Sequence, residues 1–469
     1  MAVIGAGPAG LAGAVAAGQL GLRVALVDAA EQTGGQFYRH PAPGLRARRP
    51  EALHHDWAAY AQLRDRLAAT PSVTHLPAHH VWSVVRDGDH FAVHALTGAD
   101  GTDRTPVVLR ARVLLLSTGA VERQLPFPGW TLPGVITAGG AQAMLKSGLV
   151  LPGRRIVVAG SGPLLLAAAT SLAAAGAEIP AVVEAAGYPG YARHLRALAA
   201  NPGKLTEALT HGSALLRHRI PLRSRSAVVA AHGTHRVEAV TVARLDRDWR
   251  PIPGTARRIP CDAVAVGHGL VAQTDLGTAL GCATRRSPDG THALDTGPDQ
   301  ETSVPGVWTA GESCGIGGAS AARAEGELAG IAAATRLTAQ PPDSEPLLAR
   351  SAKLRRRITR MRTFAEAMAA VHAPAPGWTA WLTDDTEVCR CEEVTAARIR
   401  EATAELGARD ARTVKLLTRA GMGWCQGRMC SAAVACLSGA GPAPDRRPLA
   451  SPVPLAALAD LPAEATEAS

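Results

Sequence analysis

The sequence predicts an α/β protein with two Rossmann-like domains, the first of them discontinuous, and a small helical module near the C-terminal end. Three observations lead to this fold class. A glycine-rich turn opens the chain at Gly5–Gly10, and a second begins at Gly160. Four cysteines form two close pairs between residues 389 and 430. Each glycine turn sits between an apolar strand and a helix-like run, which is the arrangement of a βαβ unit.

The first turn reads Gly5-Ala-Gly7-Pro-Ala-Gly10, and only Met1 and the three strand residues Ala2 to Ile4 precede it, which leaves open a start further upstream. Gly5 makes the turn, Gly7 lets the backbone approach a pyrophosphate, and Gly10 lets helix and strand pack closely. A second strand, 23–27, ends at Asp28, whose carboxylate can bind a ribose hydroxyl. The helix N-terminus faces the phosphates. The alternative is a glycine-rich turn in an ordinary α/β domain.

The second turn reads Gly160-Ser-Gly162-Pro-Leu-Leu165 and leads through a helix-like run to a strand ending at Glu184. Leu165 replaces the third glycine, so helix and strand are pushed apart. Glu184 occupies the ribose position. A carboxylate there repels a 2′-phosphate, which favours NAD over NADP if either binds. The alternative is a fold that was retained after its nucleotide was lost.

The cysteine pairs are Cys389-Arg-Cys391 and, 33 residues later, Cys425 and Cys430. A [2Fe–2S] cluster needs four converging thiolates, and the glycines before Cys425 allow a tight turn around it. Structural zinc also takes four cysteines, usually in CxxC pairs. Four unrelated buried thiols are the other alternative.

Composition sets the limits of the prediction. The chain has 469 residues, 47% of them hydrophobic, and a formal charge of +9, so we expect two to four domains. The basic run 353–362 predicts a solvated helix face rather than a nucleic-acid site. No apolar stretch reaches the roughly 18 residues of a membrane span, and the cysteines do not form a secreted disulfide pattern, so we expect a cytoplasmic protein.

Further segments resemble the two-dinucleotide-domain flavoproteins. The strand that ends in Thr118-Gly119 resembles the strand that closes an FAD domain, and Gly34-Gly35-Gln36 resembles the segment that approaches the isoalloxazine. After the second domain, Gly311-Glu312 resembles the second flavin motif, with glutamate in place of aspartate. The resemblance implies contacts of Val81 with adenine and of Glu312 with the ribityl chain. No cysteine precedes Cys261, so the redox cysteine pair of the disulfide reductases is absent.

Together these motifs resemble the FAD-containing subunits of multi-subunit amine dehydrogenases and oxidases: the hydrogen cyanide synthase B subunit, the opine oxidase A subunit, and the α subunits of proline and hydroxyproline dehydrogenases. The run Lys415–Cys430 resembles the bacterioferritin-associated-ferredoxin type of [2Fe–2S] module. The resemblance implies FAD, a [2Fe–2S] cluster on the four cysteines, a second nucleotide such as NAD in the second domain, an amino-acid-oxidase-like FAD β subunit, a small ferredoxin-like subunit, and an amine or imino acid as the electron donor.

The predicted domains follow from these motifs. The FAD domain is in two parts, 1–148 and 267–337, and a second Rossmann domain, 149–266, is inserted between them. A linker with a helix, 338–385, leads to the [2Fe–2S] module, 386–437, and a proline-rich tail, 438–469, follows. Two other functions stay open. One is an NAD(P)H-dependent reductase of a ferredoxin-type acceptor, and the other is an electron-transfer or assembly protein with no substrate site of its own.

Overall fold

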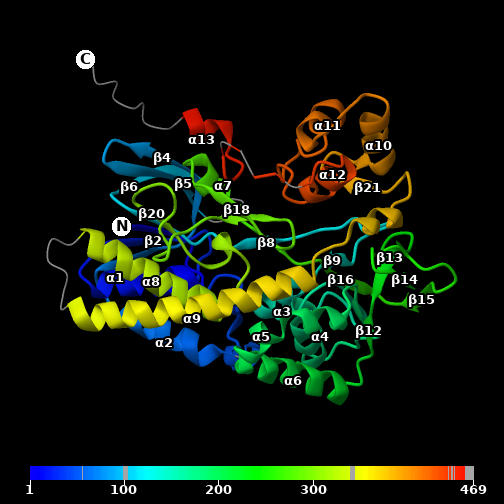
Figure 1. Cartoon of the computed structure of the whole chain (residues 1–469), viewed down its shortest axis with the longest axis horizontal. Coiled ribbons are helices and arrows are strands. Elements are labelled where there is room, and N and C mark those ends of the chain that lie inside the picture. Colours follow the sequence, from blue (N-terminus) through cyan, green and yellow to red (C-terminus); the bar gives the residue numbers. More distant parts are fainter. Residues whose placement is uncertain are drawn as a thin grey trace.

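The computed structural model describes residues 1–54, 56–98, 104–337, 344–441, 443, 444, 447 and 449–459. The predictions for residues 338–343 and for the end of the proline-rich tail lie outside these ranges. Two parallel Rossmann-type sheets and a separate helical module make up the fold, which confirms the predicted class (Figure 1). Within the described residues, no helix is both long enough and apolar enough to cross a lipid bilayer.

The first sheet is parallel and has the order β20-β7-β1-β2-β3. Its strands are β1 (Ala2–Ile4), β2 (Val24–Val27), β3 (Val73–Leu76), β7 (Leu114–Leu116) and β20 (Val307–Thr309). Strand β20 pairs with β7 although the second sheet lies between them in sequence, so the chain returns to the first sheet after leaving it. The helices that accompany this sheet are α1 (Pro8–Gln19), α2 (Trp57–Ala68) and α8 (Ala319–Leu337).

Helices α1 and α8 pack backbone to backbone, because glycines stand where they meet. A Cβ on Gly326 would lie 1.9 Å from the carbonyl oxygen of Ala9, and one on Gly330 would lie 2.3 Å from that of Gly13. No larger residue fits at either position, since real Cβ atoms do not approach that closely. This contact holds the returning part of the chain against the first glycine turn.

The second sheet has the order β12-β11-β10-β16-β9 and is also parallel. Its strands are β9 (Val135–Thr137), β10 (Ile156–Gly160), β11 (Val182–Glu184), β12 (Leu222–Ser224) and β16 (Ala263–Gly267). The helices of this half are α3 (Ala138–Gly148), α4 (Leu164–Ala174), α5 (Leu195–Ala199) and α6 (Pro202–Arg217).

Smaller elements complete the two halves. One antiparallel three-stranded sheet consists of β4 (His79–Asp87), β5 (His90–Thr97) and β6 (Thr105–Ala111). A second consists of β13 (Ser226–His232), β14 (Ala239–Arg244) and β15 (Arg257–Pro260). Strand β8 (Ala120–Glu122) pairs with β17 (Leu270–Ala272), and β18 (Thr284–Arg286) pairs with β19 (His292–Leu294). A short helix, α7 (Asp275–Ala279), lies between these pairs in the sequence.

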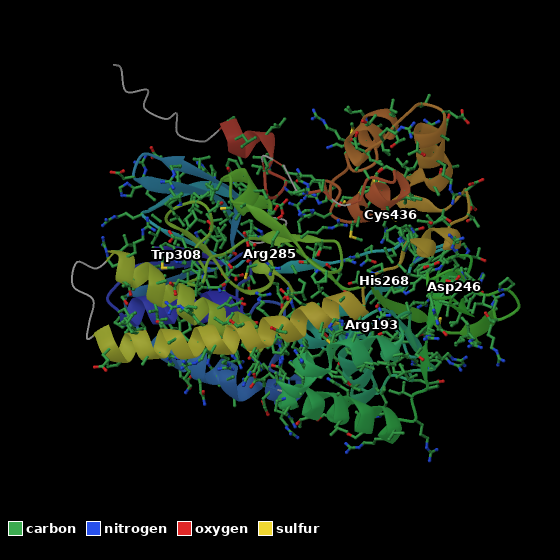
Figure 2. All side chains as sticks on the ribbon, viewed as in Figure 1. Arg193, Asp246, His268, Arg285, Trp308 and Cys436 are labelled. Carbon is green, nitrogen blue, oxygen red and sulfur yellow. The ribbon has the colours of Figure 1, made fainter. Side chains whose placement is uncertain are left out.

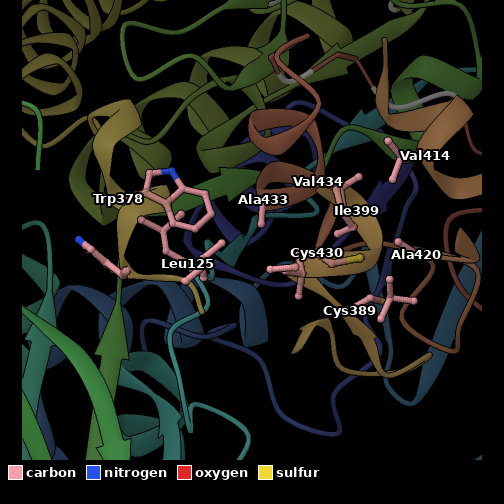
Figure 3. Packing of buried hydrophobic residues seen from close by; sticks show 14 of the residues in the cluster. Leu125, Trp378, Cys389, Ile399, Val414, Ala420, Cys430, Ala433 and Val434 are labelled. Atoms are coloured by element: carbon pink, nitrogen blue, oxygen red, sulfur yellow. The ribbon is translucent and has the colours of Figure 1, made fainter. Parts of the chain in front are cut away.

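A long helix, α9 (Ser344–Val371), crosses the middle of the molecule, contacts both halves and leads toward the C-terminal module (Figure 1). The module contains β21 (Glu387–Cys389), β22 (Val394–Thr395), α10 (Ala396–Ala404), α11 (Ala411–Thr418) and α12 (Ser431–Leu437). Its core is continuous with that of the second half, because Leu125, Trp249 and Trp381 belong to the same buried cluster as Cys389 and Cys430 (Figure 3). The module is therefore a docked part of the protein.

The tail also packs on the protein. The backbone N–H of Ala450 donates to the carbonyl oxygen of Trp82 at 2.8 Å. Leu449, Val453 and Ala457 of the tail, the last in α13 (Leu455–Ala459), cluster with Trp82 of β4. This part of the tail therefore lies against the β4–β6 sheet.

Candidate functional site: a flavin edge and a cysteine quartet

The residues predicted to bind FAD meet at one edge of the first sheet. Because β1, β2, β7 and β20 are parallel, their carboxyl ends face the same way. Ligands of such sheets bind in the crevice beyond these ends. The predicted residues follow the four strands directly: Gly5 and Gly7 after β1, Asp28 after β2, Thr118 and Gly119 after β7, and Gly311 and Glu312 after β20.

The backbone at this edge leaves room for a dinucleotide where one is expected. A Cβ on Gly7 would meet only the Cα of Gly35, at 3.9 Å, so the first turn faces open space and the Gly34-Gly35 segment. A Cβ on Gly10 would instead lie 1.8 Å from the carbonyl oxygen of Gly5. Gly10 thus allows close packing of helix on strand, and Gly7 allows close approach of a ligand. This geometry fits FAD.

Asp28 is held in place by two backbone groups. The N–H of Ala30 donates to its carboxylate at 2.7 Å, and the N–H of Ala6 donates to the other oxygen. Burial raises the pKa of Asp28, while these two hydrogen bonds oppose the rise. The carboxylate is therefore fixed beside the first turn with lone pairs left for ribose hydroxyls, which is the role predicted for it.

Glu312 accepts two backbone hydrogen bonds that no local sequence motif indicates. Its two carboxylate oxygens accept the N–H groups of Gly317 and Gly318, each at 2.9 Å, just before α8 begins. Burial raises its pKa, and the N–H of Gly317 is the main opposing influence. The side chain thus orders the loop that opens α8. Its contact with the ribityl chain stays a prediction, as do the contacts of Val81, which lies in β4, and of Gln36, whose side chain accepts from Arg39 at 3.1 Å.

A buried ion pair braces the loop at the end of β20. Glu325 of α8 is fully buried, and its carboxylate accepts from the Arg362 guanidinium of α9 at 2.6 and 2.7 Å. The same carboxylate accepts the N–H of Gly311 at 2.9 Å. Arg362 also donates to the carbonyl oxygen of Gly311 at 3.1 Å. Burial raises the pKa of the neighbouring Cys314 thiol far above its usual range, so Cys314 stays protonated.

Side chains of the chain itself lie beside the second glycine turn, although a Cβ on Gly162 would meet no atom within 4 Å. Glu184 accepts the N–H groups of Gly162 and Ala186, at 3.0 and 2.9 Å. His372, directly after α9, places its Nδ1 3.5 Å from Glu184 and 3.3 Å from the hydroxyl of Ser161. The hydroxyl of Tyr191 lies 2.6 Å from His372 Nε2. These side chains stand where a ribose would bind, and no sequence motif indicates this contact between residues so far apart along the chain.

A cavity of about 130 Å³ lies between the second glycine turn and the Gly315–Ile316 loop. Arg123, His268, Arg285 and His372 are among its lining residues, and Figure 2 labels His268 and Arg285 between the two halves. Pockets that hold drug-sized ligands span roughly 300–1,000 Å³. This cavity alone is therefore too small to enclose a dinucleotide.

The four predicted cluster cysteines come together in two pairs. Cys389 forms a side-chain hydrogen bond with Cys430, which lowers the pKa of Cys389 to about 5 and raises that of Cys430. Cys391 contacts Cys425 through the backbone and side chain of that residue. The N–H of Gly421 donates to the sulfur of Cys389 at 3.4 Å.

Pairs of thiolates suit a cluster of two irons, since each iron takes two protein ligands. Among the described residues, no group of three or more Cys, His, Asp or Glu side chains is compact enough to hold one metal ion. The arrangement of the four cysteines in two pairs fits a [2Fe–2S] centre, whereas structural zinc would need all four around a single ion.

One short segment joins the flavin edge to the cysteine module. The chain leaves Gly119 through β8 and reaches Leu125, which belongs to the buried cluster that also contains Cys389 and Cys430 (Figure 3). Six residues span at most about 22 Å. Farther along, the indole N–H of Trp130 donates to the carbonyl oxygen of Glu387 at 2.7 Å. The two candidate centres are therefore held at a fixed separation by covalent chain and shared core.

The geometry defines a flavoprotein of the two-dinucleotide-domain class with an added iron–sulfur module. The family model described as pyridine nucleotide-disulphide oxidoreductase matches residues 1–326, and the model described as BFD-like [2Fe-2S] binding domain matches residues 387–437. The chain belongs to the pyridine nucleotide-disulphide oxidoreductase family and carries a BFD-like [2Fe–2S] domain. It is an oxidoreductase whose implied cofactors are FAD and a [2Fe–2S] cluster.

Relatives match over most of the length. Hydrogen cyanide synthase subunit HcnB of Pseudomonas aeruginosa is 35% identical over 91% of this chain and 90% of its own length. The A subunit of opine oxidase from Agrobacterium tumefaciens is 34% identical over 92% of this chain and 84% of its own length. The structure of L-proline dehydrogenase from P. horikoshii has the same fold, with a TM-score of 0.66 over 97% of this chain and 78% of that one at 20% identity.

Proposed function

We propose that this chain is the FAD- and [2Fe–2S]-containing subunit of an enzyme that oxidises an amine or imino acid and passes electrons from flavin to cluster to an acceptor. The expected donors are opines, proline, hydroxyproline, glycine or sarcosine-like compounds. The observation that carries the proposal is the short connection between the flavin edge at Gly119 and the cysteine core at Leu125. Matches to subunits named for opine oxidase and hydrogen cyanide synthase support the substrate class.

The chemistry of the two cofactors explains why one chain would hold both. FAD accepts two electrons and can release them singly, whereas a [2Fe–2S] cluster accepts one. The residues of this chain would position the two cofactors, and none of them is assigned the role of a general acid or base. Asp28 and the glycine turns hold the dinucleotide, Arg362 and Glu325 brace the loop at Gly311, and the shared core fixes the distance to the cysteines.

The rival function, an NAD(P)H-dependent reductase, needs an open second nucleotide site. His372 and Tyr191 lie over Glu184 there, and the neighbouring cavity measures only about 130 Å³. Nicotinamide binding would require the end of α9 to move away. This contact favours a donor other than NADH, and it leaves the second nucleotide, NAD or similar, as a prediction.

A partner subunit is part of the proposal. Two of the relatives are named as subunits of larger enzymes. We expect an amino-acid-oxidase-like FAD β subunit and a small ferredoxin-like subunit, with the amine oxidised either here or in the β subunit. If the β subunit oxidises it, this chain acts as the electron-transfer component of the complex.

The test is an anaerobic titration of the purified holoprotein, followed by visible absorption. We expect flavin bands and a broad iron–sulfur shoulder, both bleached by an amine in the presence of the β subunit and neither bleached at a comparable rate by NADH. The Cys430→Ser variant serves as the control, because its flavin should still bleach while the shoulder is missing. Rapid bleaching by NADH alone would overturn the proposal in favour of the reductase.

A further inference from the structure

We infer that the outer face of the [2Fe–2S] module is the docking surface for an acidic one-electron carrier protein, which takes electrons from the cluster. This inference rests on the proposed function, because it assumes that electrons reach the cluster. We call this face the cluster-edge patch. Its apolar members are Leu416, Met422 and Trp424, and its cationic members are Arg390, Arg412 and Lys415.

The apolar members are unusually open to solvent. The exposed fraction is 83% for Trp424, 66% for Leu416 and 38% for Met422. A single exposed leucine needs no explanation, but a nearly fully exposed tryptophan beside other large apolar side chains marks an interaction site. Tryptophan is also among the residues that contribute most to binding energy at protein interfaces.

Part of the patch lies beside the most accessible cluster ligand. Cys391 is exposed, whereas Cys389 and Cys430 are buried. A Cβ on Gly423 would lie 2.4 Å from the Cβ of Cys391, so this cysteine packs against the backbone between Met422 and Trp424. A carrier seated on these two side chains would therefore lie against the exposed edge of the cysteine quartet.

Helix α11 extends the patch and gives it a positive charge. Arg412, Lys415 and Leu416 are three and four residues apart, and such residues lie on the same side of a helix. The opposite side of α11 carries Val414, which is buried. In Figure 1, α11 lies at the outer corner of the molecule, away from both Rossmann halves.

The cations of the patch are exposed, and Arg412 among them lies near the carboxylate of Asp410. Arg390, Arg412 and Lys415 form no ion pair in the part of the chain that the structure describes, whereas the adjacent Arg419 pairs with Glu392 at 2.8 Å. A cationic rim around an apolar centre is complementary to an acidic protein surface, and it raises the rate of encounter with such a protein. This charge argument favours an acidic carrier over a second copy of this basic chain.

The experiment measures electron transfer to a defined probe. The holoprotein, reduced chemically at its cluster, is mixed by stopped flow with an oxidised acidic plant-type [2Fe–2S] ferredoxin at several salt concentrations. We expect a second-order rate constant that falls with salt, falls about ten-fold in Lys415→Glu, and falls by a similar factor in Trp424→Ala. The matched controls are Arg217→Glu and Leu216→Ala on α6, which are also exposed and should stay within about two-fold of the wild type.

Two further measurements separate the outcomes. The iron content and electron paramagnetic resonance signal of each variant must match the wild type, which excludes damage to the cluster next to Trp424. Equal rates for Lys415→Glu, Trp424→Ala and the controls would overturn the docking surface even when flavin-to-cluster transfer is intact. Loss of β-subunit binding or of self-association in these variants, measured by light scattering, would overturn it in favour of an assembly interface. A protein without iron would instead contradict the proposed function.

Discussion

Replacement of Arg362 by methionine should destabilise the protein by about 3 to 5 kcal/mol, because it leaves a buried carboxylate without its partner. Glu325 has no exposed side-chain surface, and Arg362 is only 14% exposed. The guanidinium donates to both carboxylate oxygens of Glu325, at 2.6 and 2.7 Å. Methionine fills a similar volume but supplies no donor, so the carboxylate keeps only the N–H of Gly311 and a contact from the Cys314 thiol.

The matched control is an ion pair between the same two helices. Arg350 of α9 donates to Glu327 of α8 at 2.7 Å, but its side chain is 45% exposed. Solvent screens such pairs, so Arg350→Met should cost less than about 1 kcal/mol. The double variant Glu325→Gln with Arg362→Met removes both buried charges. We expect it to regain much of the free energy of unfolding that Arg362→Met alone loses. Together with the single variants it completes a double-mutant cycle, which gives the coupling energy of the pair.

The assay is urea unfolding of the holoprotein at a fixed FAD concentration, followed by tryptophan fluorescence and by release of flavin. Because Glu325 also positions Gly311, Arg362→Met should release FAD at a lower urea concentration than Arg350→Met does. The reasoning would be refuted if Arg362→Met and Arg350→Met differed by less than about 1 kcal/mol, or if the double variant were less stable than Arg362→Met alone.

The cluster ligands, the ribose carboxylate and a buried histidine give three other tests. Cys389→Ser should remove iron and the paramagnetic signal while FAD is retained, and loss of FAD in the same variant would contradict separate sites. Asp28→Ala should weaken FAD binding at least about ten-fold in equilibrium dialysis, since one charged hydrogen-bond acceptor contributes about 1.5–3 kcal/mol. Burial lowers the pKa of His268 to about 3, so the folded protein keeps the ring neutral while the unfolded chain protonates it below about pH 6.5. The free energy of unfolding should therefore fall by about 2 kcal/mol between pH 6.5 and 5, because only the unfolded chain takes up the proton. His268→Gln should reduce this dependence of stability on pH, measured by thermal melts at several pH values.

The sequence predicted those parts of the site that depend on local backbone chemistry. The first glycine turn, Asp28 and the Gly311-Glu312 strand end could be located because each follows a short apolar strand, and parallel strands bring their ends to one edge. The cysteine pairs could be located because thiolate spacing is itself the signal. In both cases the constraint lies within a few residues of the group it positions.

Contacts between distant elements could not be predicted in this way. The basic run 353–362 predicted a solvated helix face, and this was wrong for Arg362, which is buried against Glu325. Helical spacing places Arg362 on the face of α9 that carries the buried Leu354 and Ile358, but the basic run alone does not show that α8 supplies a carboxylate there. His372 is a similar case, since its role over Glu184 depends on the length and direction of α9.

Helix α9 connects these unpredicted contacts into one mechanical arrangement. Near its middle, Arg362 braces the loop at the flavin edge, and directly after its last turn His372 lies over the second glycine turn. The chain then enters the module, whose core includes Trp381 and the cysteines. Any movement that opened the second site for a nucleotide would pull on the helix that carries Arg362. Because Arg362 is held by a buried ion pair, such opening would disturb the flavin loop as well. If electrons pass from flavin to cluster as proposed, this arrangement would keep the path fixed, with the second Rossmann half as its scaffold.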